Sequence, residues 1–317
     1  MSFEEFLREW RNDNDFIAAF TSGSTGRPKE IRLSKKFVEE SALRTIDFFN
    51  IKEGALLHSC VSPEFIGGKM MAVRAEIAKA DLTWEEPSNM PLRNFDSNRI
   101  IDLLAVVPSQ MQYILENKET LPQIRYIIIG GSAIHPELRK KIMQSGLNAF
   151  ETYGMTETAS HIALRKVTDP VRPFQTLPGI SISVDNDSCL KISFGEDFEV
   201  QTNDIAELVS DNQFYIKGRR DNIIISGGKK INPLEIEERI SGLIPYPFII
   251  TGFPDEKWGE KSVLIIESKD FDTINLKQHL KNYLSNWEIP KEIILMENLP
   301  RTSNGKIIRN NITLPKV

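Results

Sequence analysis

The alternation of apolar runs with amphipathic stretches before Gly179 is the feature that most restricts the fold of this chain. Short apolar runs bounded by turn residues are typical of buried strands, and apolar residues at helical spacing are typical of helices that cover a sheet. Their alternation predicts α/β units. The runs predicted as strands are 16–20, 56–61, 105–107 and 124–129.

Two helices are predicted from their ends. Ser34 is a suitable N-cap, because its hydroxyl can accept from the free backbone N–H groups of a first turn. The apolar residues that then share one helical face are Phe37, Val38, Ala42, Ile46 and Phe49. A second helix is expected to follow Pro136, a favourable first-turn residue, and to end near Gly146.

The pattern changes after Gly179 to shorter alternating runs, separated by turn residues at 185–187 and 211–212. Such runs are typical of antiparallel strands, so we expect a small barrel or sheet here. A chain of 317 residues is also long enough for two domains.

The loop Thr21–Lys29, which reads TSGSTGRPK, is suited to holding phosphate. Gly23 and Gly26 let the backbone turn its N–H groups toward an anion, and Lys29 adds a cation. The residues with hydroxyl groups are Thr21, Ser22, Ser24 and Thr25. The P-loop spacing fails, because the fifth residue after Gly23 is Pro28. A Ser/Gly-rich surface turn is the alternative interpretation.

Three later segments place this loop in a family. They read ETYGMTET (151–158), GRRDNIIISGGKKI (218–231) and PRTSNGKIIR (300–309). Together with the loop, and in the family's order, they resemble the adenylate-forming superfamily of acyl-CoA synthetases, luciferases and peptide-synthetase adenylation domains. The resemblance implies an α/β fold: a large N-terminal α/β domain with a small β subdomain (1–220), then a smaller, mobile α+β C-terminal domain (221–317).

The resemblance also implies the reaction, that of an acid-thiol ligase. A carboxylate attacks the α-phosphate of ATP to give acyl-AMP and pyrophosphate, and the thiol of CoA then displaces AMP. Two anions meet in the first step, so positive charge is needed at the reacting atoms. Lys306 matches the family lysine that contacts both the carboxylate and the phosphate. A solvated turn lysine is the alternative.

The other ATP-site residues follow from the same resemblance. Glu157 matches the residue that holds Mg²⁺ across the phosphates, and Thr156 a donor to phosphate. Tyr153, followed by Gly154, offers a flat face for adenine, although Tyr153 could instead belong to the core. The main chain at Gly131 and Ser132 would border the base.

Ribose binding and domain movement are expected near Gly218. Asp204 matches the acid that accepts from the ribose hydroxyls, although Asn203 stands where the family usually has glycine. Arg219 matches its cationic neighbour, and Asp221 the hinge. Residues expected to line the CoA passage are Gly227, Gly228, Lys229 and Lys230. For the two lysines, a solvated pair at a turn is the alternative.

The acid that is activated is indicated by three further segments, 107–111, 128–134 and 153–160. They look most like the o-succinylbenzoate:CoA ligases of menaquinone synthesis. Their substrate has a second carboxylate, which requires a cation or several donors. Arg74 is the candidate cation, with Thr158 and Ser160 as helpers. Arg74 could instead pair with Glu76 or Glu85 at the surface.

Other substrates and functions remain open. Glu64, in the expected acyl-pocket segment, keeps an amino-acid substrate possible, so an enzyme that loads an acid or amino acid onto a carrier protein is the second hypothesis. Asp96 lies too far along the chain to bind an amino group, and Ile100, Ile101 and Leu104 after it predict a helix start instead. A nucleotide-binding protein without catalysis is the third hypothesis.

Composition bears on partners and location. A net charge of -5 without a dense Lys/Arg block argues against nucleic acid, and no apolar run approaches a membrane span. We therefore expect a cytoplasmic enzyme, with self-association left open. The four histidines and two cysteines, Cys60 and Cys189, show no metal-ligand spacing, and reduced, buried thiols are expected. The phosphate loop begins near the N-terminus, which suggests a compact member lacking the usual first N-terminal subdomain.

Overall fold

The computed structural model describes residues 1–21, 29–168, 170–196, 198–302, 307–309 and 312, and it divides the chain into two compact units. The first unit contains residues 1–181, 193–200 and 209–214. The second contains residues 182–192, 201–208 and 215–317. The predicted domain boundary between residues 220 and 221 is a hinge about which the C-terminal domain would move, and this hinge stays a prediction.

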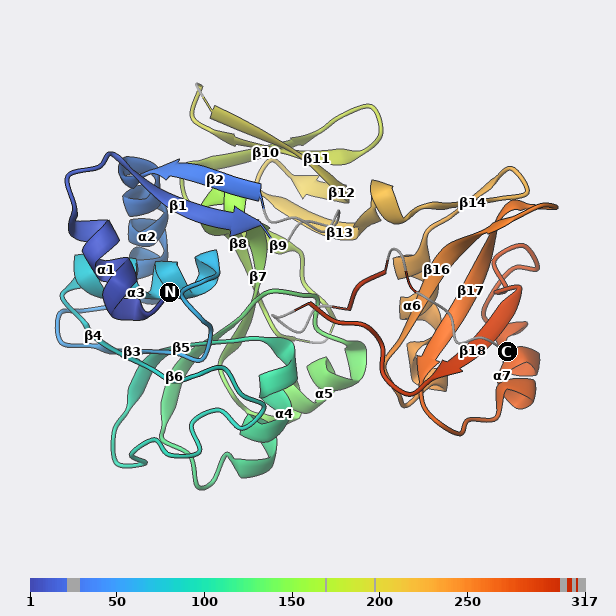
Figure 1. Ribbon diagram of the computed structural model, residues 1–317, viewed down its shortest axis with the longest axis horizontal. Coiled ribbons are helices and arrows are strands. Elements are labelled where there is room, and N and C mark those ends of the chain that lie inside the picture. The colour runs from blue at the N-terminus through green and yellow to red at the C-terminus, as the bar shows by residue number, and fades with distance from the viewer. Residues whose placement is uncertain (22–28, 169, 197, 303–306, 310–311, 313–317) are drawn as a thin grey trace. The chain divides into compact units, whose positions relative to one another are not determined.

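A mixed sheet forms the centre of the first unit (Figure 1). Its parallel strands lie in the order β4-β3-β5-β6-β7, and β8 and β9 continue it with antiparallel pairing after β7. Their bounds are β3 Leu56–Ser59, β4 Asp81–Trp84, β5 Ile101–Val106, β6 Ile124–Ile129, β7 Ala149–Met155, β8 Ser160–Lys166 and β9 Phe174–Thr176. The predicted mixed α/β fold class is confirmed.

Helices cover both faces of these parallel strands. They are α2 (Lys35–Phe49), α3 (Ile66–Ala78), α4 (Pro108–Asn117) and α5 (Pro136–Ser145). The connection from β3 to β4 runs across the sheet in the opposite direction to the connections from β5 to β6 and β7. Because such crossovers are right-handed, α3 lies on the face opposite α4 and α5 (Figure 1). Helix α2 packs on α3.

A hairpin and a short helix precede this sheet. Strand β1 (Phe16–Thr21) pairs antiparallel with β2 (Lys29–Ser34), so Thr21 and Lys29 are cross-strand partners. Helix α1 (Phe3–Arg11) begins with a capping box between Ser2 and Glu5. Buried residues of α1, the hairpin, α2 and α3 form one core, which includes Phe6, Ile17, Val38 and Met70.

The second unit has its own sheet, in the order β15-β14-β17-β16, and β18 pairs parallel with β17. The strands are β14 Ile224–Ser226, β15 Lys229–Ile231, β16 Phe248–Asp255, β17 Gly259–Glu267 and β18 Glu292–Met296, with helices α6 Pro233–Ile240 and α7 Thr273–Leu280. Its apolar core includes Ile236, Ile250, Leu264 and Leu280. The strands β10 (Ile180–Val184), β11 (Cys189–Phe194), β12 (Phe198–Ser210) and β13 (Gln213–Arg219) carry residues of both units.

The four apolar runs predicted as strands fall on β1, β3, β5 and β6, and the predicted helix ends are also confirmed. Ser34 caps α2 by accepting from the Phe37 N–H, and α5 ends at Gly146 in the left-handed conformation. The helix predicted after Asp96 was wrong: Asp96 accepts from the Asn98 N–H in a turn, and the apolar residues beyond it form β5. None of the helices in the described residues is both long and apolar enough to span a membrane.

Candidate functional site

The carboxyl ends of the parallel strands bring several predicted site residues to one edge of the first unit's sheet. Gly131 and Ser132 follow β6, and Tyr153 and Gly154 lie at the end of β7. Ligands of open α/β sheets bind at this edge. The structure thus places the expected adenine-binding segments at the carboxyl ends of the neighbouring strands β6 and β7.

The end of β7 departs from a regular strand, and this departure explains its glycine. A register shift lies between Tyr153 and Gly154 in the ladder with β8. A Cβ at Gly154 would lie 2.1 Å from the Ser160 carbonyl oxygen, so no larger residue fits without backbone movement. Tyr153 packs its ring edge-to-face on Phe214, with centroids 5.2 Å apart. One ring of the predicted adenine site therefore also belongs to a packed aromatic group.

A short turn, η1 (Thr156–Thr158), follows and contains the predicted magnesium ligand. Thr158 is buried, and its hydroxyl accepts from the Met155 N–H at 2.9 Å and contacts the Ser160 carbonyl oxygen at 2.7 Å. Thr158 therefore shapes the turn. Glu157, by contrast, has no ion-pair or hydrogen-bond partner among the described residues, and it is half-buried. A carboxylate left unpaired in this way suits a hard cation such as Mg²⁺.

A buried charge cluster supports β7 just before this turn. Glu151 accepts from Arg139 at 2.5 Å, from Arg165 at 2.8 Å and from the Ile134 N–H at 3.2 Å. Burial alone would raise the pKa of Glu151, but the charges of Arg165 and Arg139 outweigh it and lower that pKa. In the sequence, Glu151 stands out only as part of the segment 151–158. Its role in holding β7 depends on Arg139 of α5 and Arg165 of β8.

Arg74, the predicted cation of the acyl site, is 1% exposed on α3. Its Nε and Nη2 atoms have no hydrogen-bond partner among the described residues. Burial lowers the pKa of Arg74 to about 9. The alternative partners are engaged elsewhere: Glu76 accepts from Arg11 at 2.7 Å, and Glu85 accepts from the Leu92 N–H at 3.0 Å. The surface ion pair considered for Arg74 is therefore not formed.

His161 lies in the electrostatic field of Arg74. It is buried on β8, and its Nε2 lies 3.0 Å from the Thr45 hydroxyl. Burial and then the charge of Arg74 hold the pKa of His161 well below its usual value, so the ring is neutral near pH 7. Ser160, the other predicted helper, adopts a positive φ of 82° beside it.

The predicted ribose-binding and hinge residues meet in the second unit. Arg219 donates to Asp204 at 3.0 Å and to Asp221 at 3.3 Å. Asn203 donates to the same Asp221 oxygen at 3.1 Å. The hinge candidate thus accepts from a predicted ATP-site residue and from Asn203, the residue that replaces the usual family glycine.

The predicted CoA-passage residues form the tip of the β14–β15 hairpin. Gly227 and Gly228 are the two residues between the paired Ser226 and Lys229, and both have positive φ. A Cβ at Gly228 would meet no atom within 4 Å. The turn type alone requires these glycines, and the open space at Gly228 is compatible with a nearby ligand. Lys229 and Lys230 are exposed on β15.

Two arginine pairs flank the segment that contains the predicted catalytic lysine. Arg301 donates to Glu267 at 2.6 Å and 3.0 Å, and Arg309 donates to Glu237 at 2.5 Å and 2.7 Å. Lys306 itself lies outside the described residues. So do the loop residues Ser22, Gly23, Ser24, Thr25 and Gly26, whereas Lys29 is exposed at the start of β2.

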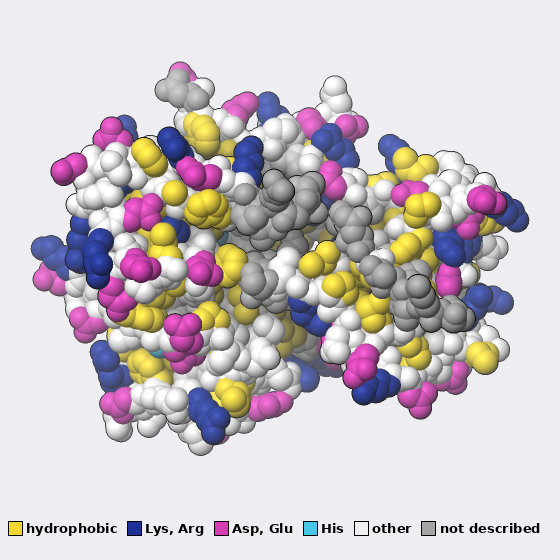
Figure 2. Space-filling view, viewed as in Figure 1, with side chains coloured by type: hydrophobic (Ala, Val, Ile, Leu, Met, Phe, Trp, Pro, Cys, Tyr) yellow, Lys and Arg dark blue, Asp and Glu magenta, His cyan; other side chains and the backbone are white. Residues whose placement is uncertain are grey.

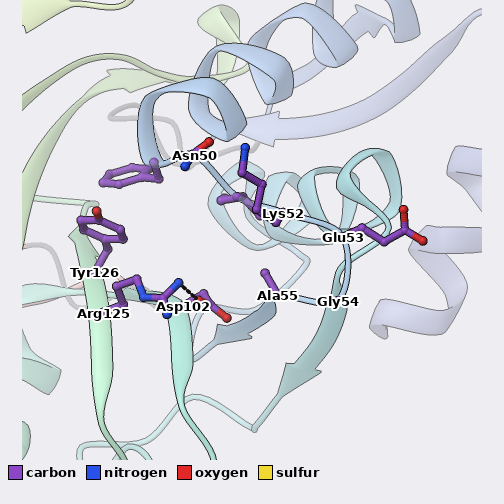
Figure 3. A pocket seen from close by; sticks show the side chains of 10 residues that line it. Asn50, Lys52, Glu53, Gly54, Ala55, Asp102, Arg125 and Tyr126 are labelled. Atoms are coloured by element: carbon purple, nitrogen blue, oxygen red, sulfur yellow. Dashed lines mark ion pairs between the residues drawn. The ribbon is translucent and has the colours of Figure 1, made fainter.

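A surface pocket of about 180 Å³ lies elsewhere on the first unit (Figure 3). It is lined by residues at the amino ends of β5 and β6, including Asp102 and Arg125, which pair at 2.6 Å. This is the edge opposite to the one where α/β sheets bind nucleotides, so we do not assign ATP to it. Figure 2 shows acidic and basic side chains interspersed over the visible face.

Comparison with known proteins identifies the class that this fold and these segments define. Residues 7–196 match the model of the AMP-binding enzyme family, and the chain belongs to that family. More particularly, it is a ligase of the AMP-forming acyl-CoA synthetase type. An acyl-CoA synthetase (AMP-forming)/AMP-acid ligase II-like protein from Dyadobacter fermentans is 34% identical, with a TM-score of 0.63 over 96% of this chain and 90% of that one.

Two further relatives carry names that specify an acid. The 2-succinylbenzoate–CoA ligase of Listeria monocytogenes is 28% identical over 97% of this chain and 72% of its own length. The o-succinylbenzoate CoA synthetase of Bacillus subtilis, solved with its acyl-adenylate, is 22% identical with a TM-score of 0.80, over 95% of this chain and 70% of that one. The same Bacillus enzyme has been solved with ATP and magnesium ion.

Proposed function

We propose that this chain is an ATP- and Mg²⁺-dependent acid:CoA ligase that acts on o-succinylbenzoate in menaquinone biosynthesis. It would convert the acid to acyl-AMP and pyrophosphate, and then transfer the acyl group to CoA. The single observation that supports this choice of acid most directly is the buried guanidinium of Arg74, which has no acidic partner among the described residues.

The unpaired atoms of Arg74 suit a carboxylate. Nε and Nη2 lie on one edge of the planar guanidinium, and together they can donate two parallel hydrogen bonds to the two oxygens of one carboxylate. A buried charge without a partner is costly, so a substrate that supplies the anion would recover part of that cost. Because Arg74 is 1% exposed, neighbouring side chains must move before an acid can reach it.

The remaining roles belong to the same proposal. Glu157 would hold Mg²⁺, which neutralises phosphate charge when bound, and Thr156 and Lys29 would donate to phosphate. Gly131, Ser132, Tyr153 and Gly154 would border adenine, and Asp204 with Arg219 would bind ribose. Lys306 would lie between the reacting carboxylate and the α-phosphate. The CoA arm would pass Gly228.

Substrate-dependent exchange of labelled pyrophosphate into ATP tests the first step. A panel of acids should include o-succinylbenzoate, an analogue without its second carboxylate, a fatty acid and several amino acids. We expect exchange with o-succinylbenzoate at the lowest acid concentration, and CoA-dependent release of AMP with the same acid.

Other outcomes would contradict the proposal in distinguishable ways. Exchange with an amino acid and no thioester with CoA would favour an enzyme that loads a carrier protein. ATP binding without exchange for any acid would indicate a nucleotide-binding protein that does not catalyse adenylation.

A further inference from the structure

Three potential metal ligands meet at the carboxyl ends of β3 and β4, outside the residues assigned above. They are His58 on β3, Cys60 directly after β3, and Glu85 directly after β4. Their ligating atoms all lie within 4.8 Å of one another. No spacing in the sequence suggests this group, because Glu85 comes from the next strand of the sheet.

The register of the two strands explains why these side chains share a face. His58 is the cross-strand partner of Thr83, and the ladder continues with a hydrogen bond from the Glu85 N–H to the Ser59 carbonyl at 3.2 Å. Side chains two residues apart point to the same side of a strand. His58 and Cys60 on one strand, and Thr83 and Glu85 on the other, are therefore neighbours on one face.

The histidine is fixed with an unused nitrogen directed at the group. His58 is 2% exposed, and its Nδ1 lies 2.9 Å from the Thr83 hydroxyl. Its Nε2 has no hydrogen-bond partner in the part of the chain that the structure describes, and it lies 3.9 Å from a carboxylate oxygen of Glu85. This separation is too long for a hydrogen bond. A metal-bound histidine is oriented in the same way, by a partner on its other ring nitrogen.

The other two ligands are also positioned by backbone contacts. The Leu92 N–H donates to both carboxylate oxygens of Glu85, at 3.0 Å and 3.1 Å. Gln110, buried at the start of α4, donates to the Cys60 carbonyl oxygen at 3.0 Å. Phe95 packs edge-to-face on the His58 ring, with centroids 4.9 Å apart, which closes the apolar side of the group.

We propose that His58, Cys60 and Glu85 bind a divalent cation of the zinc class. One nitrogen, one sulfur and one oxygen suit Zn²⁺, whereas Mg²⁺ and Ca²⁺ prefer oxygen ligands alone. Zinc bonds of about 2.0–2.2 Å from nitrogen and oxygen place those two ligands of a tetrahedron about 3.3–3.6 Å apart. The observed 3.9 Å between His58 Nε2 and the Glu85 carboxylate oxygen therefore has to shorten by only a few tenths of an ångström when the ion binds. Glu85 is partly exposed, so the fourth position can take water.

Metal binding here has a proton balance. Burial, and then the neighbouring Glu85 carboxylate, raise the pKa of the Cys60 thiol well above its usual value. Without the ion the thiol therefore keeps its proton. When Zn²⁺ binds as the thiolate complex, one S–H bond breaks, one Zn–S bond forms, and one proton leaves to solvent. The bound ion would tie β4, the edge strand, to β3.

Cobalt titration of the metal-free whole chain tests the site, because a thiolate bound to Co²⁺ gives a charge-transfer band that carboxylate and histidine ligands do not give. We expect about one Co²⁺ per chain with this band, release of a proton on binding, and displacement by Zn²⁺. Excess Mg²⁺ should leave the band intact.

Three variants make the result decisive. Cys60→Ser should abolish the band, and His58→Gln should weaken Co²⁺ binding more than about 10-fold. Cys189→Ser, which removes the other buried thiol, should behave as wild type. Absence of the band in wild type, or its persistence in Cys60→Ser, would overturn the proposal.

The change in Tm on adding Zn²⁺ is a second measurement, which can also be made on variants that are less stable than wild type. Zn²⁺ should raise the Tm of wild type and of Cys189→Ser, because an ion that binds only the folded state stabilises it. Cys60→Ser should show no such rise. Equal rises in Cys60→Ser and wild type would also overturn the proposal, whatever the ligase activity of the chain.

Discussion

Arg309 donates from both of its terminal nitrogens to Glu237, and one of the same carboxylate oxygens accepts from the Ile250 N–H at 2.7 Å. The pair joins the last arginine of the segment 300–309 to α6 and β16 in the second unit. In the sequence, Arg309 stands three residues after Lys306.

We expect Arg309→Lys to lower kcat for adenylation about 10- to 100-fold, because a lysine cannot make both bonds and small displacements of catalytic groups are costly. The KM for ATP should change much less. Pyrophosphate exchange at saturating acid measures both. The control is Arg239→Lys, which disrupts the two-bond pair with Glu288 in the same unit. If both variants lose adenylation equally, general destabilisation of the unit is responsible and the positioning role is excluded.

Lys306→Ala should lose at least about 100-fold in adenylation, since the variant lacks a charge placed where negative charge develops. It should still convert supplied acyl-adenylate and CoA to the thioester at the wild-type rate. Single-turnover assays of the two half-reactions separate these effects. Lys269→Ala, which changes an exposed lysine of the same unit, should leave both half-reactions intact. Equal loss of both half-reactions in Lys306→Ala would remove the assignment.

Arg74→Met should stabilise the folded protein and weaken its use of the dicarboxylate substrate. Arg74 is a buried charge without an acidic partner among the described residues, so replacing it by an apolar side chain should raise the free energy of unfolding by about 1–4 kcal/mol in urea titrations. The KM for the dicarboxylate should rise at least about 30-fold, the equivalent of about 2 kcal/mol, while a monocarboxylate analogue is used as before. A variant that handles the two acids as wild type does would show that Arg74 binds neither.

The same residue predicts a pH dependence. Burial lowers the pKa of Arg74 to about 9, so the guanidinium loses its proton as the pH rises through that value. kcat/KM for the dicarboxylate should then fall above about pH 9, because this ratio reports groups of the free enzyme. The monocarboxylate analogue should show no such fall. A common alkaline limb for both acids would point to another group.

His161 predicts loss of stability in acid. Its folded-state pKa lies well below the usual value of 6.5, so below that pH the unfolded chain takes up a proton that the folded chain does not. Stability should decrease as the pH falls below 6.5, by as much as about 1.4 kcal/mol per pH unit. In urea titrations at several pH values, His161→Gln should flatten this dependence. The exposed His279 provides the control, and an equal flattening in His279→Gln would contradict the assignment.

Gly228→Leu should block thioester formation while adenylation continues. The open space beside Gly228 can accept a side chain, which would then project from the hairpin tip. Gly228→Ala measures the backbone cost alone, because its φ of 76° is unfavourable for any side chain. If alanine and leucine reduce CoA transfer equally, strain in the turn explains the loss and no passage is needed.

The sequence best predicts features that depend on residues close together in the chain. The cap at Ser34 and the strand at 124–129 depend on residues within a few positions, and the structure has both. The predicted strand at 105–107 is shorter than β5, because Ile101 and Leu104 also fit a helical spacing and are predicted to belong to a helix that begins at Asp96. Short apolar runs are ambiguous in this way, and only pairing of β5 with β3 and β6 resolves them.

The sequence predicts which segments contribute to the candidate site, but it does not predict which side chains contact one another there. The motifs around Tyr153 and Gly131 were found in order along the chain, and the sheet brings them to one edge. The burial of Arg74 was undecided, because α3 has no clear polar side: its residues 68–75 are all buried. The grouping of His58, Cys60 and Glu85 was missed, because it depends on a register between two strands that no spacing in the sequence encodes.

The register shift at Tyr153 and Gly154 has a further consequence for how a contiguous motif can work. In an unbroken ladder, adjacent side chains point to opposite faces, so at most every second residue of a run could serve one ligand. The shift, the turn at 156–158 and the positive φ angles of Ala159 and Ser160 interrupt that alternation. The side chains of adjacent residues in this segment therefore need not point to opposite faces of the sheet. A deletion that restored regular pairing would keep the strands and dismantle the arrangement of the motif.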